Sequence, residues 1–82
     1  MKAKKQKPKI YGDFNNRDEL GRIRLLESSQ EDIVRLGLVP NDGMEIEVHD
    51  FDLSADAIVR FSDIEKIWVA EIDWEKIRYK SE

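Results

Sequence analysis

Hydrophobic and polar residues alternate along much of this chain, and a period of two is the pattern of β-strands with one buried face. The clearest run is 44–49, in which Met44, Ile46 and Val48 alternate with two glutamates and a histidine. The same alternation predicts four further strands, over residues 9–15, 22–26, 55–61 and 67–74. The last of these has large apolar residues at both even and odd positions, which predicts a central strand covered on both faces.

One segment departs from this alternation, between the second and third predicted strands. Ser28 or Ser29 can cap a helix with an acidic residue three positions further on, and Ile33 and Leu36 would form its inward face. Gly37 follows as a typical end of a helix. Because so short a helix is unstable alone in water, we expect it to pack on the sheet.

Turn-forming residues separate these elements and indicate how they connect. They occupy residues 15–21, 40–43, 50–54 and 62–66, and the first of these turns predicts a hairpin between the first two strands. Residues 75–79 fit either a strand or a single helical turn, of which we favour the turn. Together the elements predict a mainly β fold, a small five-stranded antiparallel barrel or strongly bent sheet, SH3-like, with one short helix.

Charge divides the chain into two unequal parts. The first nine residues contain no acid and carry five lysines, Lys2, Lys4, Lys5, Lys7 and Lys9. Residues 10–82 carry nine Lys and Arg against eighteen Asp and Glu, a balance that repels phosphate backbones. We therefore expect residues 1–8 to be a flexible basic tail and residues 9–82 to form a single small β-rich domain. Nucleic acid would have to bind through the tail lysines.

Length and cysteine content limit the size of the core and indicate the redox environment of the protein. A chain of 82 residues has room for one modest core. The absence of cysteine excludes disulfides, thiolate metal ligands and a cysteine nucleophile. A reducing cytoplasm is the setting this composition favours, and we identify no export signal or membrane anchor.

One acidic turn invites comparison with a calcium loop. Asp50, Asp52 and Asp56 are spaced like the first oxygen ligands of such a loop. The remaining pattern fails, because Ala55 stands where the turn needs glycine and Phe61 where a bidentate glutamate is needed. We interpret the segment as an acidic hairpin turn and expect no metal site.

Few residues of this sequence are of the types and spacings that catalysis needs. His49 is the single histidine, and its place on the predicted solvent face favours a surface residue over a ligand or general base. The four glycines form neither a nucleophile elbow nor a phosphate-binding loop. We therefore expect no enzymatic activity and no cofactor.

The first predicted hairpin is the best candidate for recognition. Tyr11 lies on the opposite strand face from Ile10 and Phe14, and pairing of the first two strands would bring it close to several arginines. The candidate binding residues are Tyr11, Asn15, Asn16, Arg17, Arg22 and Arg24. They suggest a non-catalytic module that binds a protein partner. One alternative is that the arginines only balance the acidic body through weak surface pairs, and another is a nucleic-acid-associated small β-barrel that uses the lysine-rich tail.

Several motifs resemble known sequences. The segments 12–18, 21–25, 40–44 and 68–74 are similar to those of a group of short, uncharacterised bacterial proteins, and the likeness spans residues 10–78. It implies a shared small fold and brings no activity with it. Residues 39–48 also resemble the glycine-then-strand segment of SH3-like barrels.

Overall fold

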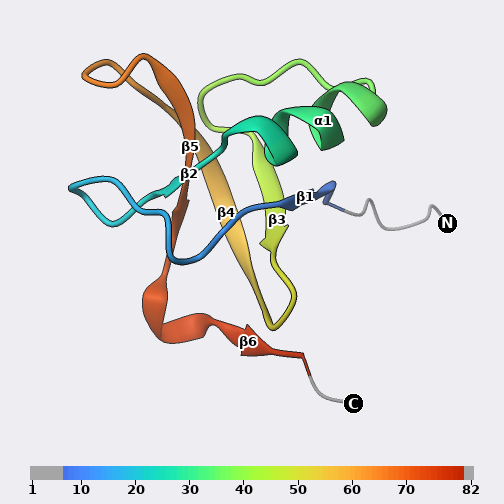
Figure 1. Cartoon of the computed structure of the whole chain (residues 1–82), viewed down its shortest axis with the longest axis vertical. Helices are drawn as coiled ribbons and strands as arrows, with labels where there is room; N and C mark the ends of the chain where they lie inside the picture. The colour runs from blue at the N-terminus through green and yellow to red at the C-terminus, as the bar shows by residue number, and fades with distance from the viewer. Residues whose placement is uncertain (1–6, 81–82) are drawn as a thin grey trace, which may run out of the picture.

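A computed structural model describes residues 7–80 of the chain, and it is mainly β with one α-helix (Figure 1). The elements in chain order are β1 (Lys9–Tyr11), β2 (Ile23–Arg24), α1 (Glu27–Arg35), β3 (Glu45–His49), β4 (Leu53–Ser62), β5 (Ile67–Ile72), the 3-10 helix η1 (Trp74–Lys76) and β6 (Arg78–Tyr79). The predicted class, a small strongly bent β-sheet with one short helix, is confirmed. Within residues 7–80, none of the helices has the length and apolarity needed to cross a membrane.

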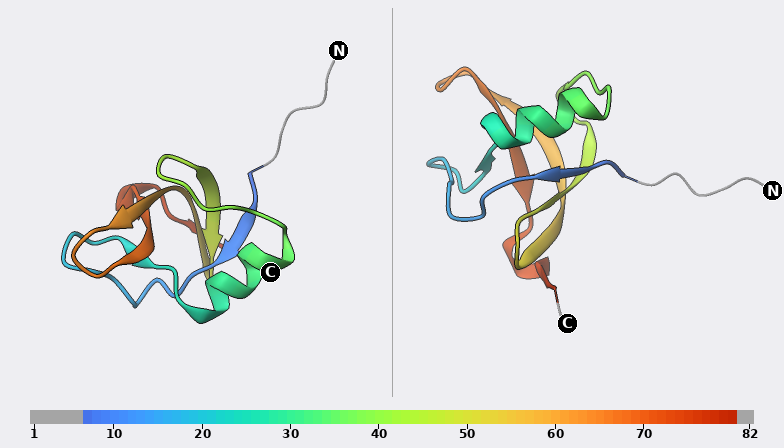
Figure 2. Two further views of the ribbon diagram at one scale, coloured as in Figure 1. Left: turned by 90° about the horizontal axis from the view of Figure 1, so that it is seen from above. Right: turned by 45° about the vertical axis from the view of Figure 1, so that its right-hand side comes forward.

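The strands form one curled half-barrel sheet in the order β1-β3-β4-β5-β2, with β6 paired to the start of β4. β3, β4 and β5 make an antiparallel meander. The ten-residue β4 pairs with β3 along its first half and with β5 along its second half, so the sheet can bend along this strand. Figure 2 shows the sheet curling round, with α1 lying beside β1.

The predicted hairpin between the first two strands is wrong. β1 pairs parallel with β3, in the register Ile10 to Val48, whereas β2 pairs with β5 at the other edge of the sheet. The turn formers close a smaller antiparallel loop of their own, in which the Arg24 N–H donates to the Asn16 carbonyl at 3.0 Å. Alternation specifies which face of a strand is buried and leaves its partner open, which is why the pairing was not predicted.

The core lies on the concave side of the sheet and confirms the predicted inward faces. Ile46 and Val48 of β3 are fully buried, as are Val69 and Ala70 of β5. Burial of two successive β5 residues shows that both faces are covered at the middle of this strand, whereas its ends are half-buried. The other buried hydrophobic residues are Ile10, Phe14, Ile23, Leu25, Ile33, Ala55, Ala57 and Val59.

The helix forms where it was predicted, but its start differs in detail. Its N-cap is Leu26, with no side-chain cap, and Ser29 is buried inside the first turn. Among the predicted inward residues, Ile33 is buried and Leu36 is 42% exposed. Gly37 adopts a φ of +69° immediately after the helix, the left-handed conformation that ends helices and favours glycine.

The ambiguous segment near the C-terminus contains both of the predicted structures. Residues Trp74–Lys76 form a 3-10 turn in which the Glu75 N–H donates to the Asp73 carboxylate. β6 follows at once and pairs Tyr79 with Leu53. Both readings of residues 75–79 therefore hold, one after the other along the chain.

Candidate functional site

Tyr11 is held at the end of β1 by bonds from the helix. The buried Ser29 hydroxyl donates to the Tyr11 carbonyl at 2.5 Å, and the Asp32 carboxylate accepts the Tyr11 N–H at 2.8 Å. Because the side chain of Ile10 points into the core, that of Tyr11 points outward. The helix thus fixes the position from which this ring is presented.

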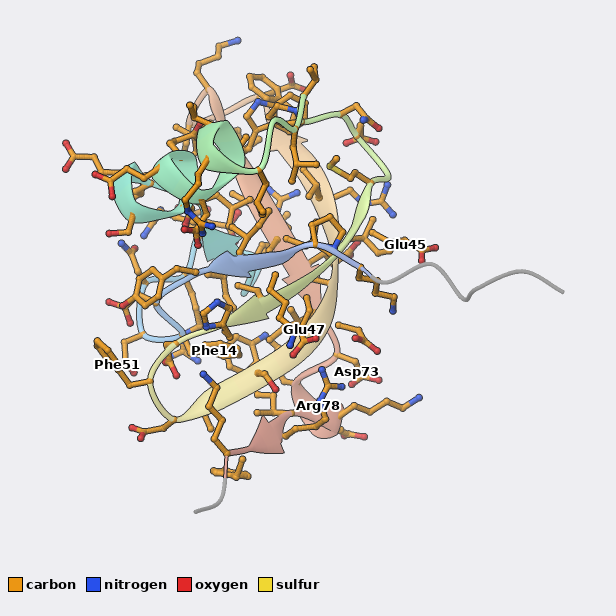
Figure 3. The ribbon with its side chains drawn as sticks, turned by 90° about the vertical axis from the view of Figure 1, so that its right-hand side faces the viewer. Phe14, Glu45, Glu47, Phe51, Asp73 and Arg78 are labelled. Carbon is orange, nitrogen blue, oxygen red and sulfur yellow. The ribbon has the colours of Figure 1, made fainter. Side chains whose placement is uncertain are left out.

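An aromatic cluster surrounds this ring. His49 lies opposite Tyr11 in the parallel β1–β3 register, with ring centroids 6.2 Å apart and edge-on. Phe51, in the turn between β3 and β4, also contacts the Tyr11 ring, at the same centroid distance. Its side chain is 87% exposed, and Figure 3 shows it projecting away from the part of the surface that carries Glu45 and Asp73. Other large apolar side chains are as exposed, among them Ile64 at 89%, and Phe51 is distinguished from them by its contact with the Tyr11 ring.

An open pocket of about 520 Å³ lies next to Tyr11. We call it the Tyr11 pocket. Three segments line it, namely β1 with the loop after it, β2, and the first turn of α1. Its residues are Tyr11, Asp13, Asn16, Arg24, Leu26, Glu27, Ser28 and Ser29. Three of the six predicted binding residues, Tyr11, Asn16 and Arg24, therefore meet at one surface feature.

The Tyr11 pocket is lined by more negative than positive side chains. The Arg24 guanidinium donates to both oxygens of Glu65 at 2.7 and 2.8 Å and to the Asn16 side-chain oxygen at 2.9 Å. The bond to Glu65 raises the pKa of Arg24 and holds the pKa of Glu65 below its usual value. The carboxylates of Asp13 and Glu27 are exposed and have no ion-pair partner within residues 7–80. Negative charge is therefore in excess around the pocket.

The other three predicted residues lie outside the pocket. Arg17 lies over the Trp74 ring, 5.0 Å from its centroid, and Arg22 pairs with Asp18 at 2.9 Å. Asn15 is exposed in the turn, where its N–H donates to the Asp13 carboxylate. Since these positions were grouped by assuming the first hairpin, its absence separates them. The alternative that arginines balance the acidic body describes Arg22 well.

Two further carboxylates are tuned by their neighbours. Burial alone would raise the pKa of Asp18, but hydrogen bonds from Arg22 and Leu20 outweigh it, so the pKa lies below its usual value. The same holds for Asp32, whose pKa is lowered, against burial, by hydrogen bonds from Arg35 and from the Tyr11 N–H. Both groups thus remain charged and hold backbone in place.

Lys7, one of the two described lysines of the tail, lies against an acidic surface. The Lys7 ammonium lies 3.4 Å from an Asp56 oxygen, and Arg78 reaches Glu47 and Asp56 at 3.5 Å. Figure 3 shows Glu47 and Arg78 close together on this face. Lys9 is exposed on β1. The remaining tail lysines, Lys2, Lys4 and Lys5, fall outside the described residues.

The acids of the calcium-like segment serve local structure. One Asp50 oxygen accepts the N–H groups of Asp52 and Leu53 at 2.8 and 2.7 Å, which closes the β3–β4 turn. Asp56 is on β4, beside Lys7. Over residues 7–80 no three acidic, histidine or cysteine side chains are placed to hold one metal ion.

Sequence reasoning missed Phe51, Asp13 and Glu27 as members of this surface. Phe51 carried a usable signal, since an aromatic between two aspartates in a polar turn has no strand face into which to bury. Asp13 and Glu27 carried none, because only the β1–α1 contact brings them to one pocket.

Comparisons of the chain with protein-family models, with curated proteins and with solved structures gave no match.

Proposed function

We propose that this chain is a non-catalytic interaction module that docks a protein partner at the Tyr11 pocket, and that it does so in the cytoplasm as a small SH3-like barrel. The observation that carries the proposal is the half-buried Tyr11, which lines the pocket and contacts the ring of the exposed Phe51. Rigid aromatic side chains contribute much contact area at little cost in conformational entropy, and they are enriched among residues that dominate binding energy.

The support of Tyr11 favours this use. Its backbone N–H and carbonyl are both bonded to α1 side chains, so the ring is presented from a fixed position. A preorganised anchor loses less freedom on association than a mobile one. The site therefore has the rigidity that a docking surface needs.

The test is quantitative capture of native partners by the wild type, Tyr11→Ala, Phe51→Ala and a chain lacking residues 1–6. The deletion stops there because the Pro8 carbonyl accepts the Glu47 N–H at 2.8 Å. We expect either aromatic substitution to weaken binding by about 1 to 3 kcal/mol, the cost of truncating an anchor, and the deletion to have little effect.

Ile64→Ala is the matched control, since this side chain is as exposed as Phe51, at 89%, but lies in the turn between β4 and β5, whereas Phe51 contacts the Tyr11 ring. Thermal melts establish that each variant is folded. If binding is lost on deleting residues 1–6, falls steeply with salt and is indifferent to Tyr11→Ala, the partner is a nucleic acid held by the lysines and the proposal is wrong.

A further inference from the structure

On the premise that the Tyr11 pocket is the docking site, we propose that it receives a cationic segment of the partner. An arginine or lysine side chain would lie on the Tyr11 and Phe51 rings with its charge towards Asp13 and Glu27. The proposal names the chemistry of the partner, which the proposed function leaves open.

The balance of charge around the pocket is the first argument. Arg24, which lines the pocket, is already matched by Glu65, and Arg35 is matched by Asp32, whereas Arg17 lies over the Trp74 ring. Asp13 and Glu27 are matched by no cation within residues 7–80, and the exposed Asp52 follows Phe51 directly. An incoming cation therefore meets unpaired carboxylates, whereas an incoming anion meets repulsion.

The aromatic rings are the second argument. A guanidinium or ammonium group is attracted to the face of an aromatic ring by the ring quadrupole. The chain uses this interaction internally, because the Arg17 guanidinium lies 5.0 Å from the centroid of the Trp74 ring. The Phe51 ring, 87% exposed and in contact with Tyr11, is accessible to a cation from outside, and Asp13 lines the pocket beside Tyr11.

The N-terminus of α1 is the feature of the pocket that would most favour an anion, but the acidic residue in its first turn opposes anion binding. The helix has no side-chain N-cap, so its first N–H groups are open to an acceptor. Glu27 stands in that first turn and lines the pocket. Its carboxylate offsets the partial positive charge of the helix end, which leaves the cation as the favoured occupant.

The test is a titration of the whole chain, followed by amide chemical shifts, with a pentapeptide of alternating arginine and glycine. Its neutral twin carries citrulline in place of arginine, which keeps the length and planar end group but replaces one amino group by a carbonyl oxygen and removes the charge. We expect shifts at residues 13–16, 27–29 and 51, with a dissociation constant of about 1 mM. The citrulline peptide should bind about three- to tenfold more weakly, as loss of exposed charge pairs implies.

Two substitutions, Asp13→Asn and Glu27→Gln, remove the charges while keeping side-chain oxygens that can accept hydrogen bonds. Combined, they should weaken the arginine peptide about three- to tenfold. Asp63→Asn, an exposed carboxylate in the β4–β5 turn, should change nothing. The dispersion of the amide spectrum shows that each variant is folded.

The cationic proposal is overturned by equal binding of both peptides, by absence of shifts at the pocket at about 5 mM arginine peptide, or by pocket shifts with a thymidine oligonucleotide. If native partners still require Tyr11 but tolerate Asp13→Asn with Glu27→Gln, the cationic proposal fails and the docking function stands. If Tyr11→Ala and Phe51→Ala retain those partners, the docking function itself fails.

Discussion

Gly12 directly follows β1 and lies between Tyr11 and Asp13, which both line the Tyr11 pocket. It is buried, and its N–H donates to the His49 carbonyl at 2.9 Å. A Cβ placed there would lie 2.5 Å from Val48 Cγ2 and 3.2 Å from Ile23 Cγ2. Both atoms belong to branched side chains of the core, so neither can move away freely. Glycine is therefore needed at this position for close approach.

Gly12→Ala should lower the free energy of unfolding by about 1 to 3 kcal/mol, the usual cost of overpacking a core. Urea unfolding measures this change. Gly37→Ala is the comparison, because a Cβ there meets nothing within 4 Å and the φ of +69° supplies the only strain. That strain costs about 1 kcal/mol. A Gly12→Ala chain as stable as the wild type would show that Val48 and Ile23 can yield.

At the scale of elements, α1 and β1 are joined by side-chain bonds at one position. β1 is an edge strand of three residues, and exposed strand edges invite pairing with other chains. Ser29 and Asp32 form hydrogen bonds with the Tyr11 carbonyl and the Tyr11 N–H, respectively. The helix therefore both closes the edge and positions the ring of the candidate site.

Ser29→Ala should destabilise the chain by about 1 kcal/mol, because it leaves the part-buried Tyr11 carbonyl without its donor. Ser28→Ala is a matched control one residue away, exposed and making the same change in helix propensity. Its effect should stay within about 0.5 kcal/mol. Urea midpoints of the two variants decide the matter, and equal midpoints would mean that the Ser29 bond contributes nothing.

The sequence predicted elements better than their pairing. Strands with strict alternation, such as the run around Ile46 and Val48, were placed nearly at their true bounds, because one buried face dictates the pattern. The partner of β1 lies far along the chain and leaves no local mark. The cap was misassigned because the hydroxyl of Ser29, a good capping residue by type, is used in a tertiary bond to Tyr11.

The candidate site was predictable to the extent that it depends on one strand. Tyr11 was expected to face outward because its neighbours face inward, and it does. Arg17 and Arg22 were grouped with it on an assumed hairpin and lie elsewhere. Asp13 and Glu27 join the site only through the packing of α1 on β1.

At the scale of the whole molecule, three carboxylates make stability depend on pH. The pKa values of Asp18, Asp32 and Glu65 lie below the ordinary 3.8 of aspartate and 4.5 of glutamate. The folded chain therefore binds fewer protons than the unfolded chain near these values. The stability that these groups supply is complete above their ordinary pKa values and is lost as pH falls through the lower folded ones.

The melting temperature should accordingly be flat from pH 7 to about pH 5 and fall steadily below that. Measurement in about 0.15 M salt limits long-range repulsion among the other carboxylates. Glu65→Gln should start from a lower value at neutral pH, since it removes the charge facing Arg24, and should fall less on acidification. A melting temperature that rises towards pH 3 would contradict this reading of the three carboxyl groups.

Two strand pairings, β1 with β3 and β2 with β5, also limit when each strand can pair during synthesis of the chain. As the chain is synthesised, at about 5 to 20 residues per second, β1 has no partner strand until β3 emerges, and β2 has none until β5 does. The hairpins β3–β4 and β4–β5 join neighbours in sequence and need no such wait. Tyr11 and Arg24, which both line the Tyr11 pocket, belong to β1 and β2. The pocket is therefore complete only when β5 has emerged and paired with β2, and a chain that presents it is one in which both pairings have formed.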